Sequence, residues 1–135
     1  MIAIVCLDDR KGMLFNRRRQ SKDRAVVEKL LEMTKGSRLW IHPFSEKLFV
    51  ENRAEHIVSD ECFLEKAGRG EYCFVENCGL AEAGERLEKI IVFWWNRSYP
   101  SDLRLDLCLE EWKRTETEEF AGHSHEKITR EVYER

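Results

Sequence analysis

The order of apolar and charged segments predicts an α/β protein that is built on a mostly parallel sheet. Continuous apolar runs, which are typical of strands buried on both faces, alternate along the chain with segments of helical spacing. Two segments with strand-like alternation follow at the C-terminus and predict an antiparallel pair at one edge of the sheet. The chain has 135 residues, so we expect one domain over residues 1–135.

The first half of the chain is expected to contain strands and helices in alternation. Ile2–Leu7 is an apolar run rich in β-branched residues and predicts the first strand. The first helix is expected to have Ser21 as its cap and to continue, with an apolar stripe at helical spacing, to Thr34. Residues 37–42 then predict a short strand, and residues 43–51 a helix with a proline in its first turn.

The second half of the chain continues this alternation and ends in the antiparallel pair. The strongest strand is expected over residues 90–96, a stretch that contains no charged residue. The other expected elements are short strands over 55–59 and 71–77, helical segments over 60–68 and 80–89, and the paired strands over 110–120 and 125–134.

Composition and charge limit the classes of partner. The formal net charge is −3 and the isoelectric point is near 5.9, which argues against a nucleic-acid partner because such domains are usually basic. No apolar run approaches the ~20 residues that a membrane span needs. The five cysteines form no Cys-x-x-Cys pair, which predicts reduced thiols and a cytoplasmic location. The oligomeric state stays open, a homodimer included.

The C-terminal segment EEWKRTETEEFAGHSHEKITREVYER resembles the end of the dihydrofolate reductase family, which reads roughly W…SEF…NSHSYxFEILER. The upstream segment EKIIVFWWNRSYPSDLRLDL and the N-terminal order of strand, glycine, loop and helix are also similar to that family. The resemblance implies the three-layer α/β/α dihydrofolate reductase-like fold, with a central sheet of about seven strands. The residues in register with the C-terminal pattern are Trp112, Phe120, Ser124, His125, Val132, Tyr133, Glu134 and Arg135.

The resemblance also implies a function and a catalytic residue. The leading hypothesis is an NADPH-dependent reductase of a pterin or folate-type heterocycle, with a small molecule as its partner. In the family an acidic residue near the start of the first helix binds the pteridine ring, and Asp23 stands at that place. A buried carboxylate with a raised pKa suits this role. From its position alone, Asp23 is instead a carboxylate that interacts with the positive N-terminal end of the helix.

The segments that meet the cofactor in the family differ in this sequence. The family's MGRxT junction is replaced by Ile41-His42-Pro43-Phe44-Ser45, and its paired glycines by Glu76-Asn77-Cys78-Gly79. A carboxylate beside a diphosphate is repulsive, whereas free backbone N–H groups bind phosphate. The resemblance therefore implies NADPH binding at Ser45, Asn77 and Gly79, but in a degenerate site. The segment between residues 59 and 71 is too short for the family's strand and helix, so one strand is expected to be absent.

A ligand is expected at the C-terminal ends of the first and fifth strands, because open α/β sheets bind ligands at such edges. The basic stretch Arg17–Arg24 borders this edge and has three interpretations: a solvated loop, the wall of a site for an anionic small molecule, or a contact for RNA or DNA. The candidate substrate-binding residues are Cys6, Leu7, Asp8, Phe15 and Arg19.

Two alternatives to the reductase stay open. One is a non-catalytic small-molecule-binding or regulatory module of the same fold. The other is an RNA-binding or nuclease-type protein that uses Arg17–Arg24. No metal site is expected, because His123 and His125 have no further ligands at a recognisable spacing and are predicted to be exposed strand residues.

Overall fold

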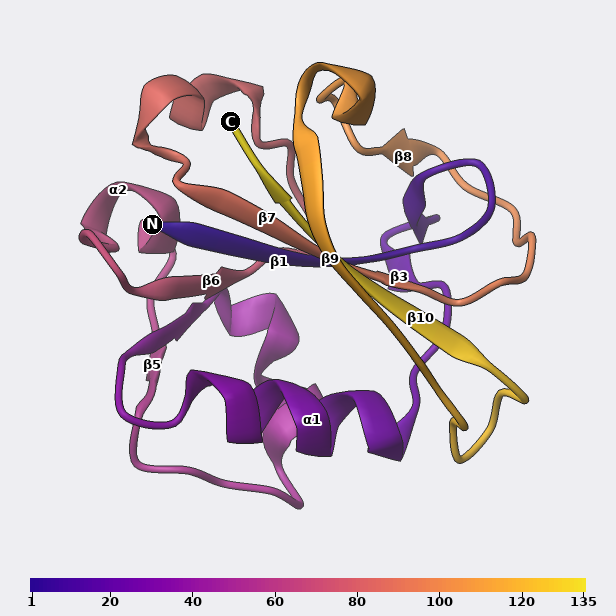
Figure 1. Ribbon diagram of the computed structural model, residues 1–135. Coiled ribbons are helices and arrows are strands. Elements are labelled where there is room, and N and C mark those ends of the chain that lie inside the picture. The colour runs from indigo at the N-terminus through magenta and orange to yellow at the C-terminus, as the bar shows by residue number, and fades with distance from the viewer.

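The computed structural model describes all residues from Met1 to Arg135 and is built on a seven-stranded sheet (Figure 1). The strand order is β5-β4-β6-β1-β7-β10-β9, in which the first five strands are parallel and β10 runs antiparallel to both β7 and β9. This arrangement confirms the predicted mostly parallel sheet with an antiparallel C-terminal hairpin. The strands are β1 (Ile2–Leu7), β4 (Leu39–Ile41), β5 (Ile57–Ser59), β6 (Tyr72–Phe74), β7 (Lys89–Trp94), β9 (Lys113–Phe120) and β10 (Ile128–Glu134).

Helical segments cover both faces of the sheet and form the outer layers of a three-layer α/β/α fold. The helix α1 (Arg24–Thr34) and the 3-10 helix η1 (Pro43–Phe49) pack on one face. The short helix α2 (Phe63–Lys66) and the 3-10 helices η2 (Ala81–Arg86) and η3 (Leu109–Glu111) lie on the other face. None of these helices has the length and apolar character that crossing a membrane would require.

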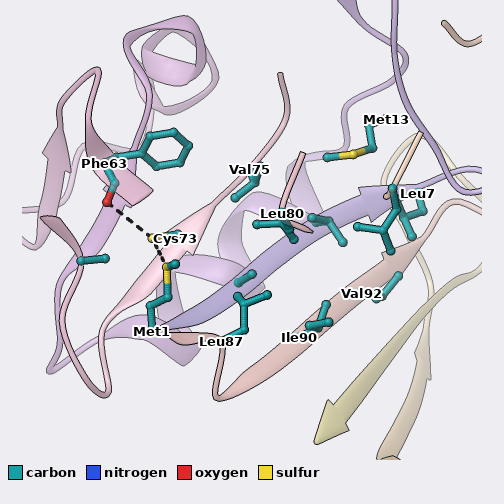
Figure 2. Packing of buried hydrophobic residues seen from close by; sticks show 14 of the residues in the cluster. Met1, Leu7, Met13, Phe63, Cys73, Val75, Leu80, Leu87, Ile90 and Val92 are labelled. Carbon is teal, nitrogen blue, oxygen red and sulfur yellow. Dashed lines mark hydrogen bonds between the residues drawn. The ribbon is translucent and has the colours of Figure 1, made fainter. Parts of the chain in front are cut away.

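The core has two halves because successive side chains of a strand point to opposite faces. In β1, Ala3, Val5 and Leu7 contribute to one buried cluster, whereas Ile4 contributes to the other. Figure 2 shows the first cluster, where Leu7 of β1 and Ile90 and Val92 of β7 lie in one group with Leu80 and Leu87, the residues on either side of η2. Both faces of the central strands are therefore apolar, which explains why these strands read as continuous apolar runs.

A small three-stranded sheet, which the sequence did not predict, lies beside the main one. Its order is β3 (Arg18–Arg19), β2 (Gly12–Phe15) and β8 (Leu103–Arg104). β2 and β3 form a hairpin with a two-residue turn, whose residues Asn16 and Arg17 have φ values of 52° and 60°. Two positive φ values in a two-residue hairpin turn are typical of type I′. Part of the predicted basic loop is therefore a hairpin, with Arg17 at its tip.

Other local predictions were wrong at the ends of elements. α1 begins at Arg24 with Asp23 as its N-cap, because the extended Asp23 accepts a hydrogen bond from the backbone N of Ala25, so Ser21 is not the cap. The expected helix over 80–89 is a 3-10 segment interrupted by Gly84, which has a φ of 53°. His125 is neither in a strand nor exposed, since it lies in the β9–β10 connection and is only 4% exposed.

Candidate functional site

An ion pair joins the β2–β3 hairpin to the end of β6. The guanidinium of Arg19 forms two hydrogen bonds with Glu76, Nε to Oε2 at 2.5 Å and Nη2 to Oε1 at 2.7 Å. Ser45 donates a third hydrogen bond to Oε1 of Glu76, at 2.7 Å. The Glu76 side chain is only 8% exposed, and its hydrogen bonds raise the pKa of Arg19. Bidentate pairs of this kind are geometrically specific. The Arg19 guanidinium and the Ser45 hydroxyl are therefore both held by hydrogen bonds to Glu76.

Cys6 lies beside this ion pair at the C-terminal end of β1. Burial raises the pKa of the Cys6 thiol strongly, and the negative charge of Glu76 raises it further. The positive charge of Arg19 acts in the opposite direction but is the smaller effect. Because the thiolate is the nucleophilic form of cysteine, this raised pKa disfavours nucleophilic reaction of Cys6.

Asn77 and Gly79, the other predicted cofactor residues, lie on the turn that follows β6. The Nδ2 of Asn77 lies 3.4 Å from Nδ1 of His42, while its Oδ1 is buried without a hydrogen-bond partner. A Cβ on Gly79 would overlap the carboxylate of Asp106. That carboxylate accepts hydrogen bonds from the backbone N of Leu80 at 2.7 Å and of Ala81 at 3.1 Å. The first N–H groups of η2 are thus held by a carboxylate of the same chain.

Asp23 is fully engaged in joining α1 to the β9–β10 connection. Its Oδ1 accepts from the backbone N of Ala25 and His123, and its Oδ2 accepts from the backbone N of Ser124 and His125 and from the His125 ring. Burial alone would raise the pKa of Asp23, but these hydrogen bonds outweigh it and lower the pKa to about 2. The expectation of a raised pKa was therefore wrong, because five donors stabilise the ionised form.

A hydroxyl pair completes this network, and sequence reasoning missed it. The Oγ of Ser21 lies 3.0 Å from Nε2 of His125, and the hydroxyl of Tyr99 lies 3.1 Å from the same nitrogen. Tyr99 also donates to Ser21 Oγ at 3.3 Å. Ser21 and His125 are 104 positions apart in the chain. No local pattern connects residues at that separation, so only the fold brings them together.

The predicted substrate-binding residues are spread over several environments. Leu7 is fully buried in the core, whereas Phe15 on the hairpin is 45% exposed. Asp8 is also fully buried and accepts hydrogen bonds from the backbone N of Arg10, Gly12 and Tyr99. Burial opposes the effect of these bonds, but the net result is a lowered pKa for Asp8. Of the predicted set, Cys6 and Arg19 are the two that the fold brings together beside Glu76.

Two adjoining cavities form a basic cleft between the hairpin, the start of α1 and η1. The first has a volume of about 600 Å³ and the second about 700 Å³, and both are lined by Arg19, Lys22 and Lys47. In addition, the first is lined by Arg17 and Arg18. Ser21 and Glu46 also line the first cavity. The second cavity has an apolar part of its wall, which is formed by Val27, Leu48 and Val50.

Comparison with known proteins gives a match in structure but not in sequence. No protein-family model matches the chain, and no curated protein matches it in sequence. Among solved structures, it is similar to the dihydrofolate reductase of Enterococcus faecalis complexed with NADP(H) and RAB-propyl, with a TM-score of 0.70 and 11% identity. The match covers 99% of this chain and 95% of that protein. The chain therefore has the dihydrofolate reductase-like fold that its sequence predicted.

The residues at the cofactor positions do not suit a bound dinucleotide as they stand. The hydroxyl of Ser45 is bonded to Glu76, and Asp106 holds the backbone N–H groups that follow Gly79. The carboxylates of Glu76 and Asp106 thus lie at the predicted cofactor positions, and the negative charge of a dinucleotide at close range would be repelled by them. Asn77 Oδ1 is the one free acceptor among these groups.

Proposed function

We propose that this protein is a small-molecule-binding module of the dihydrofolate reductase-like fold that binds an organic anion and does not use NADPH. The observation that carries the proposal is a difference between the predicted cofactor residues and the basic cleft beside them. At the predicted cofactor positions, the Ser45 hydroxyl and the backbone N–H of Leu80, which follows Gly79, are hydrogen-bonded to carboxylates of the same chain. The adjoining cleft presents cations that have no ion pair.

The charge of the cleft supports an anionic ligand. Arg17, Arg18, Lys22 and Lys47 line the first cavity, and none of them lies in a salt bridge. Glu46 is the acidic residue of that lining. Arginine binds carboxylate and phosphate groups through two hydrogen bonds, and lysine adds a point charge. The cleft therefore offers an excess of positive charge in a protein whose overall charge is negative.

The shape of the cleft supports a ligand with an apolar body. Ligand sites are commonly about 300–1,000 Å³, and each of the two cavities falls within that range. Val27, Leu48 and Val50 line the second cavity beside Lys47. A molecule with an aromatic or aliphatic part and a carboxylate or phosphate group matches this combination.

Thermal-shift measurements over folates, nucleotides and sugar phosphates test the proposal. We expect at least one organic anion to raise the melting temperature in a saturable way, and Arg18→Ala to weaken that stabilisation. Lys35→Ala is the matched control, because Lys35 is an exposed cation that follows α1 and lies outside the cleft. Equal weakening by the two variants would contradict the assignment of the cleft.

The cofactor part of the proposal needs its own measurement. NADPH carries phosphates and is itself an anion, so binding alone does not identify a dinucleotide site. Energy transfer from the tryptophans to NADPH at high micromolar cofactor should show either no saturable signal or a signal that Arg18→Ala removes. A saturable signal that persists in Arg18→Ala would contradict the proposal and favour the reductase.

An NADPH-dependent reductase of a pterin or folate is the second candidate. One observation favours it: Asn77 Oδ1 is a buried acceptor without a partner at a predicted cofactor position. Such unpaired buried groups are rare in folded proteins. Under this candidate, Asn77→Ala abolishes NADPH binding, whereas under the first it leaves organic-anion binding in the cleft unchanged.

A further inference from the structure

Ser21, His125 and Asp23 have the geometry of a nucleophile, a base and an orienting acid. Ser21 Oγ lies 3.0 Å from Nε2 of His125, and Nδ1 of the same ring lies 2.9 Å from Asp23 Oδ2. These distances lie within the hydrogen-bond reach that links a nucleophile to its base and the base to a third group. Such a constellation is recognised by its geometry and not by its order in the chain. We propose that Ser21 is a nucleophile that hydrolyses carboxylic esters, with His125 as its general base.

The hydrogen bonds assign the protons. Asp23 is ionised at neutral pH, so its Oδ2 accepts a hydrogen bond from the N–H group at Nδ1 of His125. In the neutral ring, Nε2 is then the acceptor. The hydroxyls of Ser21 and Tyr99 lie 3.0 Å and 3.1 Å from this nitrogen, and when Tyr99 donates to Ser21 Oγ the Ser21 proton is directed to Nε2. In that arrangement the donors run from Tyr99 through Ser21 to His125.

The imidazole is held in this orientation from several sides. Its side chain is 3% exposed, and the ring of Trp95 stacks on it at 4.7 Å with an interplanar angle of 21°. Gly122 allows the close approach of the turn, since a Cβ there would lie 2.7 Å from Asp23 Oδ2. A base whose rotamer is locked by packing loses little free energy in reaching its reactive geometry.

Ser21 is accessible from the basic cleft. Its side chain is partly exposed, and it lines the first cavity together with Arg18 and Lys22. The backbone N–H groups of Ser21 and Lys22 donate to no acceptor within the protein. Backbone N–H groups at the nucleophile stabilise the oxyanion in acyl transfer. Ser21 thus lies in the wall of the cleft, with the buried His125 ring behind it and with backbone N–H groups at positions 21 and 22 that have no acceptor in the protein.

The reaction balances with water as the co-reactant. Ser21 Oγ bonds to the carbonyl carbon of the ester as its proton passes to Nε2 of His125. The carbon–oxygen bond to the alcohol then breaks, and that proton passes to the leaving oxygen. A water molecule attacks the acyl-Ser21 carbonyl, gives one proton to His125, and releases the carboxylic acid as the Ser21–acyl bond breaks and Oγ recovers a proton from His125.

The same contacts would also serve a purely structural role, since Asp23 anchors the β9–β10 connection to α1. The two roles differ in one respect. A structural hydroxyl at Ser21 gives no covalent adduct, whereas a nucleophile activated by His125 is acylated faster than other hydroxyls of the protein.

The experiment treats the whole protein with p-nitrophenyl acetate and follows p-nitrophenolate release and intact mass. We expect a burst that approaches one equivalent and one acetyl group on Ser21, located by peptide mapping. Ser21→Ala should abolish the burst and the acetyl group, because it removes the attacking hydroxyl, with an unchanged circular dichroism spectrum. Ser59→Ala is the control, because Ser59 is an exposed serine on β5 that lines neither cavity of the cleft.

A second variant keeps the proposal testable if Ser21→Ala is poorly folded. In Ser21→Cys, the new thiol should be alkylated by iodoacetamide at pH 7 on the order of 10-fold faster than the exposed Cys108, since an adjacent base activates a thiol. No adduct on Ser21, or acetylation of Lys22 instead, overturns the proposal. Because p-nitrophenyl acetate is uncharged, this result does not depend on anion binding in the cleft, so the two proposals fail independently.

Discussion

Replacing Asp23 by asparagine removes the most highly connected carboxylate of the molecule. Asn keeps the size of the side chain, but one oxygen becomes an NH₂ group. The Oδ2 atom of Asp23 accepts from the backbone N of Ser124 at 2.7 Å, the backbone N of His125 at 3.1 Å and its ring at 2.9 Å. In Asp23→Asn, these three donors meet either the new NH₂ group, which is itself a donor, or an uncharged amide oxygen.

The magnitude follows from the pKa of Asp23. The folded-state pKa is about 2, against an ordinary value of 3.8. This difference corresponds to about 2 kcal/mol of stabilisation by the ionised form. Because the pKa is lowered on folding, the stabilisation is complete above pH 3.8 and is lost as the pH falls towards 2. Unpaired buried donors in the variant add about 1–3 kcal/mol, so we expect a total loss of about 3–5 kcal/mol at pH 7.

Urea unfolding followed by tryptophan fluorescence, from pH 7 down to pH 2, measures the total loss of unfolding free energy and the part of that loss that depends on pH. The difference in unfolding free energy between wild type and Asp23→Asn should shrink by about 2 kcal/mol between pH 7 and pH 2. Asp102→Asn is the control, because exposed Asp102 accepts one hydrogen bond, from the backbone N of Asn16, and should lose about 1 kcal/mol or less. A difference for Asp23→Asn that is independent of pH would refute this reasoning.

Three further predictions concern packing, turn geometry and thiol reactivity. Gly122→Ala should lower the unfolding free energy by about 1–3 kcal/mol, because its Cβ would lie 2.7 Å from both Asp23 Oδ2 and the His125 carbonyl oxygen. Urea unfolding measures this loss, and an unchanged unfolding free energy would contradict the close packing at Gly122. Arg17→Gly should raise the melting temperature and add up to about 1 kcal/mol, because Arg17 has a φ of 60° in a turn that favours glycine; a lower melting temperature would count against a type I′ turn. Iodoacetamide at pH 8 should modify exposed Cys108 on the order of 10-fold faster than Cys6, whose thiol pKa is raised by burial, and equal rates in peptide mapping would show that Cys6 is accessible.

The arrangement of the sheet could be predicted because its signal is local. Ile2–Leu7 is apolar at every position, as a strand buried on both faces must be, and it became β1 with its predicted bounds. The end of α1 at Thr34 was also predicted correctly. The start of α1 was not, because Ser21 and Asp23 are both good cap residues. Ser21 pairs with His125 instead, and Asp23 caps the helix.

The candidate site was only partly predictable. The sequence indicated that the basic stretch Arg17–Arg24 borders a cleft, and the cavities lie there. It did not indicate that Arg19 pairs with Glu76, since the two residues are 57 positions apart. It also placed His125 on an exposed strand, although the β9–β10 connection folds the ring under Trp95.

The sequence by itself determined the α/β class, the first strand and the end of α1, because each depends on neighbouring residues or on the spacing within one element. Only the tertiary structure decided which charges are paired and which are free. In the folded chain Arg19 forms an ion pair with Glu76, and Asp23 is hydrogen-bonded to His125. Arg18 forms no ion pair and lines the cleft. The physical reason is that hydrogen bonds and ion pairs depend on distance in space, and the sheet brings together residues that are far apart in the chain.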